Sequence, residues 1–164
     1  MSPDIIALIV KATGQTLYMV AVAGLIGSLF GIPLGVFLAT SGRGELFPAP
    51  SVNKVLGAIV NATRSTPFII LVVAIIPFTR LVAGTSIGTS AAIVPLTIAT
   101  IPFVARLVET AIREVDPGLT EAARAMGASP IQIVFKVLLA EARPGIASAS
   151  VSYTHLTLPT NREV

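Results

Sequence analysis

Long apolar runs dominate the pattern of hydrophobic and polar positions along this chain. Between Lys11 and Arg43 lie 31 residues without a charge. Because a helix rises 1.5 Å per residue and a bilayer core is about 30 Å thick, residues 16–40 are long enough to cross it. The run is longer than the apolar part of a signal peptide and follows only Asp4 and a single Lys11. It predicts a first membrane span that is retained.

Two further apolar regions follow, and each is interrupted. Residues 41–54 carry Gly, Pro and charges and predict a loop. A second span is expected with its core at 67–78 and an extension backwards through 55–62. The third apolar run, 81–105, opens with a polar turn at 84–88, so its membrane helix is expected from about Ser90 to Leu107. The polar interruption within the second region consists of Asn61, Arg64, Ser65 and Thr66.

Prolines and small residues indicate how these spans pack. Pro95 and Pro102 should kink the third span. The backbone carbonyls that the prolines leave unpaired need partners on neighbouring helices, and this arrangement is expected where helices pack around a transport path. In the first span, small residues recur every fourth position and would let another helix approach closely. Glycine is also simply common in membrane helices, and this alternative stays open. The small residues are Gly27, Gly31, Gly35 and Ala39.

The polar residues before Pro67 allow two interpretations. An arginine at the centre of a span costs about 2.5 to 3.5 kcal/mol, so Arg64 should lie near an interface or face a polar cavity. It either extends towards the cytoplasmic surface, or it lines or gates a translocation path together with Asn61 and Ser65.

Residues 116–145 form a long segment that is too polar to span a bilayer. Asp116 is a good N-cap and Pro117 suits a first helical turn, so a helix should run from here to a C′ glycine at Gly127. Ser129 caps a second helix. This helix should bury one apolar stripe, opposite Gln132, Lys136 and Glu141. The stripe consists of Ile131, Val134, Phe135, Leu138 and Leu139.

Composition and motifs exclude several classes of function. The chain is 54% hydrophobic and 12% charged, as expected of a membrane protein. Its basic residues flank apolar spans instead of clustering, which argues against nucleic acid as a partner. The sequence has no phosphate-binding loop of the G-x-x-x-x-G-K-[ST] type, no Cys, and His155 as its one histidine. We therefore expect no enzyme activity, no cofactor and no metal site.

Lys and Arg residues predict the orientation in the membrane. Three lie between the first and second spans, one between the second and third, and five after the third before residue 145. Since positive charge favours the cytoplasmic side, the first and last groups should be cytoplasmic and the N-terminus outside.

The segment 116–145 resembles the EAA loop of ABC-importer permeases, whose pattern is E-A-A, three residues, G, nine residues, I-x-L-P. The matching residues are Glu121, Ala122, Ala123, Gly127 and Leu139, with Val137 at the Ile position and Ala140 at the Pro position. The change at Ala140 removes a helix breaker. Further runs, including STPFIILVVAIIPFTR at 65–80 and PFVARLVE at 102–109, are similar to the methionine-type permeases. The similarity covers roughly residues 15–148.

The resemblance implies an all-α, polytopic permease: three transmembrane helices plus a cytoplasmic coupling-helix segment, a fragment of a five-helix protein in the bacterial inner membrane. It implies uptake of D- and L-methionine driven by ATP. The implied partners are two copies of an ATP-binding subunit, a second permease chain in a homodimer, an extracytoplasmic substrate-binding lipoprotein and membrane lipid. Glu121, Ala122, Ala123 and Gly127 would couple the chain to the ATP-binding subunit.

Three alternatives for the function and for the segment 116–145 stay open. The substrate could be another small amino acid, the protein could be a non-transport scaffold or regulatory subunit, and 116–145 could be amphipathic helices lying on the membrane. The final residues, SYTHLTLPTNREV, are too polar for a fourth span. We therefore expect an incomplete permease domain at 1–150 and a non-native tail at 151–164.

Overall fold

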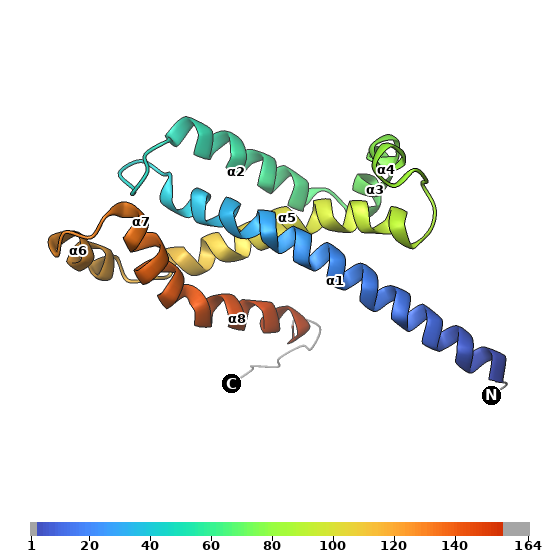
Figure 1. Ribbon diagram of the computed structural model, residues 1–164. Helices are drawn as coiled ribbons and strands as arrows, with labels where there is room; N and C mark the ends of the chain where they lie inside the picture. Colours follow the sequence, from blue (N-terminus) through green and yellow to red (C-terminus); the bar gives the residue numbers. More distant parts are fainter. Residues whose placement is uncertain (1–2, 156–164) are drawn as a thin grey trace, which may run out of the picture.

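The computed structural model describes the backbone of residues 3–155, and all regular elements of this part are helical (Figure 1). The last expected segment, 151–164, falls mostly outside the described residues, and the division at residue 150 stays a prediction. The elements are α1 (Pro3–Thr40), α2 (Pro50–Ser65), α3 (Phe68–Ala74), α4 (Ile76–Ala83), α5 (Thr89–Arg113), α6 (Pro117–Ala125), α7 (Pro130–Gln132), the π-helical turn η1 (Ile133–Leu138) and α8 (Leu139–His155).

Two of these helices, α1 and α5, are each long and apolar enough to cross a membrane. The first begins at Pro3, well before the expected start at residue 16, because no further proline lies between these positions and Asp4 suits a first turn. With 38 residues, α1 is about 57 Å long at 1.5 Å per residue. Its N-terminal part extends away from the other helices (Figure 1).

Small residues on α1 allow close contact with α5, as the sequence predicts. A Cβ atom added to Gly27 would lie 2.5 Å from Thr100 Cγ2, and one added to Gly31 would lie 2.8 Å from Val104 Cβ. Ala39, at the end of the same series, is 5% exposed. This contact joins the first span to the third along much of α5 (Figure 1).

The expected second span is not a single straight helix. Helices α2 and α3 meet at a bend of 108°, so together they form a broken span or a re-entrant loop. Pro67 explains the break: its ring disfavours helical geometry in the preceding residue, and Thr66 is extended with ψ of 127°. The expected loop at 41–54 is also shorter, because α2 already starts at Pro50.

The third span agrees closely with expectation. Helix α5 starts at Thr89 after a turn in which Gly84 and Gly88 have φ of 72° and 107°. It continues to Arg113, six residues beyond the expected end at Leu107. Pro95 and Pro102 lie inside it and are buried.

The largest group of buried apolar residues lies where the ends of α1 and α5 meet α6, η1 and α8. Val108 and Ile133 are fully buried there, at 0% exposure. This core fixes the segment after α5 against the two long helices. Its members are Ala39, Val108, Ala111, Ile112, Ala123, Ile133, Val134, Leu138 and Ala142.

Candidate functional site: the segment after α5 and a polar cluster on α5

Local capping shapes the segment after α5 as the sequence predicts. The Asp116 carboxylate accepts a hydrogen bond from the Gly118 N–H at 2.8 Å and caps α6. Gly127 has φ of 81°, the left-handed conformation of a C′ glycine. Ser129 and Gln132 form a reciprocal capping box at the next helix start. The two helix starts and the glycine between them give the segment a defined turn.

The residues of the E-A-A motif divide between surface and core. Glu121 and Ala122 are exposed, whereas Ala123 is 4% exposed and belongs to the apolar core. Gly127 is exposed, and no atom lies within 4 Å of the position that a Cβ would take. The motif therefore attaches α6 through Ala123 and leaves Glu121 and Ala122 exposed.

The expected apolar stripe of the second helix is only partly correct. Val134 and Leu138 are buried, but Ile131 and Phe135 are 62% and 66% exposed. The π-helical turn η1 explains the difference, because its hydrogen bonds span five residues and shift the buried face relative to an α-helix. Ile133, outside the predicted stripe, is fully buried instead.

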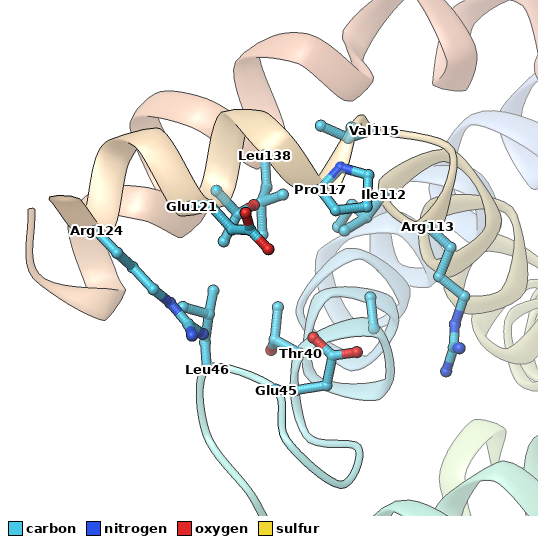
Figure 2. Close-up of a pocket in the computed structure, with 12 residues that line it drawn as sticks. Thr40, Glu45, Leu46, Ile112, Arg113, Val115, Pro117, Glu121, Arg124 and Leu138 are labelled. Atoms are coloured by element: carbon cyan, nitrogen blue, oxygen red, sulfur yellow. The ribbon is translucent and has the colours of Figure 1, made fainter.

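A hollow of about 350 Å³ lies between the end of α1, the loop after it, the end of α5 and α6 (Figure 2). Glu121 and Arg124 border it from α6, Glu45 from the loop and Arg113 from α5. The sequence drew attention to Glu121 but not to Glu45 or Arg113, since residues of distant segments meet here only through folding. The hollow brings the E-A-A glutamate beside the loop between α1 and α2.

The three polar residues predicted around a transport path lie together at the end of α2, and all are exposed. Their environments differ. Asn61 Oδ1 accepts a hydrogen bond from Arg106 Nη2 of α5 at 2.6 Å. The Ser65 hydroxyl donates to the carbonyl of Ala62 within its own helix at 3.0 Å. The structure thus links Asn61, but not Ser65, to a second element by a side-chain bond.

A buried carboxylate on α5 is the strongest polar feature that the sequence analysis missed. Glu109 is 4% exposed and accepts bonds from two arginines on its own helix. Arg106 contacts one carboxylate oxygen, and Arg113 Nη2 lies 3.0 Å from the other. Their spacing of three and four residues along an apolar helix was the signal available in the sequence.

The described residues offer no group of three or more His, Cys, Asp and Glu side chains that could hold a metal ion. The chemistry available at these sites is therefore hydrogen bonding and charge pairing by Asn, Arg and Glu.

Sequence comparison identifies relatives over most of the chain. It is 58% identical over 151 residues to the probable D-methionine transport system permease protein MetI of Vibrio cholerae, covering 92% of this chain and 67% of the relative. It is 49% identical over 158 residues to the D-methionine transport system permease protein MetI of Escherichia coli K12, covering 96% of this chain and 72% of the relative.

Solved structures of transporters also match the fold of this chain. A structure of inward-facing conformations of the MetNI methionine ABC transporter matches with a TM-score of 0.87 at 49% identity, over 93% of this chain and 70% of that chain. An amino acid ABC transporter with histidines matches with a TM-score of 0.59 at 22% identity, over 93% and 71% of the two chains. This second match shows the fold alone.

A family model of transport proteins matches residues 31–153. The matched region includes the C-terminal end of α1 and every helix from α2 to α7, and extends into α8. The chain therefore belongs to the family described as the binding-protein-dependent transport system inner membrane component.

Proposed function

We propose that this chain is a permease subunit of an ATP-driven importer that takes up methionine, in both the D and L forms. The observation that carries the proposal is the joint match in sequence and fold to methionine permeases, at 49% identity and a TM-score of 0.87 over 93% of the chain. Another small amino acid is the alternative substrate.

In this proposal, the segment from α6 to η1 docks on an ATP-binding subunit. Glu121 and Ala122 are exposed and form the docking surface, and Gly127 maintains the turn behind it. Ala123 is buried against the core shared with α1 and α5, so a displacement of α6 is passed to both long helices. ATP hydrolysis belongs to the partner subunit, and this chain transmits its motion.

The proposed assembly pairs two permease chains with two ATP-binding subunits and receives substrate from an extracytoplasmic binding lipoprotein. Large apolar side chains along α1 are exposed, Leu8, Leu17 and Leu25 at 67%, 65% and 73%. In an importer such a surface is covered by lipid or by other transmembrane helices.

We also propose an orientation and a transport path. The distribution of Lys and Arg supports an N-terminus outside and the α6–η1 segment in the cytoplasm, where ATP is available. Asn61, Arg64 and Ser65 would then border the path at the bend between α2 and α3. The 108° bend supports this, because an interrupted helix at membrane depth is tolerated where it is covered by protein or faces a water-filled cavity.

The test is uptake by the full-length permease, reconstituted in vesicles with its ATP-binding subunit and the binding lipoprotein. We expect ATP-dependent accumulation of labelled L-methionine that unlabelled D-methionine reduces by competition. Stronger competition by another small amino acid would replace methionine as the substrate. Failure of the permease to co-purify with an ATP-binding subunit would instead favour a scaffold or regulatory protein.

A further inference from the structure

Two asparagine side chains of α2 form hydrogen bonds that hold it against α1 and α5. Near its start, Asn53 Nδ2 donates to the Leu38 carbonyl at 2.7 Å and to Ser41 Oγ at 2.9 Å. Near its end, Asn61 Oδ1 accepts from Arg106 Nη2 at 2.6 Å. Val60 is the buried residue of α2. Hydrogen bonds at two points therefore add to the apolar packing that attaches this helix.

The bond at Asn61 depends on the charges of α5. Glu109 is buried and contacts both Arg106 and Arg113, so one carboxylate faces two guanidinium groups. Arg113 alone would neutralise the carboxylate, and the positive charge of Arg106 is therefore in excess. Asn61 supplies an additional oxygen acceptor for it. Glu109 holds one nitrogen of the guanidinium while the other reaches α2.

The acceptor on α2 is neutral and exposed, and both properties favour release. The neutral Asn61 oxygen lacks the Coulomb attraction between opposite charges that a carboxylate at the same place would add. Water in the proposed transport path can replace the Asn61 oxygen when the helices separate, because Asn61 is exposed at the place where this path is proposed. By contrast, Glu109 is buried and would be left uncompensated if both arginines moved away. The contact between helices is thus the part of the cluster that breaks most easily.

We infer that Glu109 is a positioning residue for the transport cycle: it holds Arg106 against Asn61, and this bond fastens α2 to α5 in one state and is released in another. The inference rests on the proposed transport function. The bend between α2 and α3 follows Asn61 within the same broken span, so release would free the segment bordering the proposed path.

The test uses the full-length permease in complex with its ATP-binding subunit, reconstituted in vesicles. Asn61→Asp replaces the neutral acceptor with a carboxylate and should hold α2 more firmly, lowering the kcat of uptake roughly threefold to tenfold with KM unchanged. Asn61→Ala removes the bond and should lower the number of methionine molecules imported per ATP. Glu109→Gln should also lower this number, and adding Asn61→Ala to it should cause no further loss.

Lys54→Ala, an exposed change on the same helix, is the matched control and should behave as wild type. Wild-type kcat and import per ATP in both Asn61 variants would overturn the inference, as would additive effects of Asn61→Ala and Glu109→Gln. Loss of complex assembly in all the cluster variants would show a structural role only and would also overturn it.

Basal ATP hydrolysis is measured in parallel. If the wild type imports no methionine, the proposed substrate fails, while changed basal hydrolysis in the Asn61 variants still supports the releasable bond.

Discussion

Gly35 of α1 lies against Val108 of α5 so closely that a Cβ atom on the glycine would come within 2.8 Å of Val108 Cβ. Val108 is fully buried, and its neighbours include residues of the segment after α5. The glycine thus lets the end of the first span reach the core that supports the proposed docking surface.

We predict that Gly35→Ala and Gly31→Ala destabilise the full-length protein, whereas Gly24→Ala does not. The added methyl groups would collide with Val108 and Val104 respectively, while the Gly24 position has no atom within 4 Å. Overpacking of this kind costs about 1 to 3 kcal/mol. Thermal unfolding of the purified complex measures the effect, and equal melting temperatures in all three variants would contradict close packing at these glycines.

Adjacent alanines of the E-A-A motif should respond differently to the same change. Ala123→Leu places a large side chain in the core and should lower stability by about 1 to 3 kcal/mol, since Ala123 is 4% exposed. Ala122→Leu, at an exposed position, should leave stability unchanged but weaken binding of the ATP-binding subunit.

Thermal unfolding of the isolated full-length permease and co-purification with the ATP-binding subunit separate these two effects. The docking proposal fails if Ala122→Leu retains the partner as well as the wild type does. The assignment of Ala123 to the core fails if its leucine variant unfolds at the wild-type temperature.

The sequence predicts the long helices well because a membrane span depends on a continuous apolar run. The small residues of α1 likewise predict its close contact with α5, as the short distances at Gly27 and Gly31 confirm. The polar residues up to Thr66 predict only an interruption within one span, whereas the proline that follows Thr66 is the physical cause of the bend.

Two other structural features cannot be predicted from the sequence, each for its own reason. The π-helical turn at Ile133–Leu138 contains no Gly or Pro that would mark it, and an α-helical period predicts Phe135 inside instead of Ile133. The bond between Asn61 and Arg106 joins residues 45 positions apart. Local patterns cannot reveal such a contact, which arises from the packing of α2 beside α5.

At the end of α2, we predict that Arg64→Ala lowers methionine uptake several-fold while the complex still assembles. Arg64 is exposed and precedes the bend at Thr66, the place where a path-lining charge would act. Arg64→Lys keeps the positive charge and should retain more uptake than the alanine variant. Wild-type uptake by Arg64→Ala in reconstituted vesicles would exclude a role for this side chain in the path.

Gly127→Val should uncouple ATP hydrolysis from transport. The glycine has φ of 81°, where a side chain costs about 1 to 2 kcal/mol and a β-branched residue is especially unfavourable. No atom lies within 4 Å of its Cβ position, so the effect would come from the backbone and not from a collision.

Gly127→Asn is the matched control, because asparagine tolerates the left-handed conformation and should preserve the turn. Uptake and stimulated ATP hydrolysis are measured together in vesicles: we expect both at wild-type levels in the asparagine variant, and reduced import per ATP in the valine variant. Normal import per ATP with Gly127→Val would mean that the conformation of this turn is not needed for coupling.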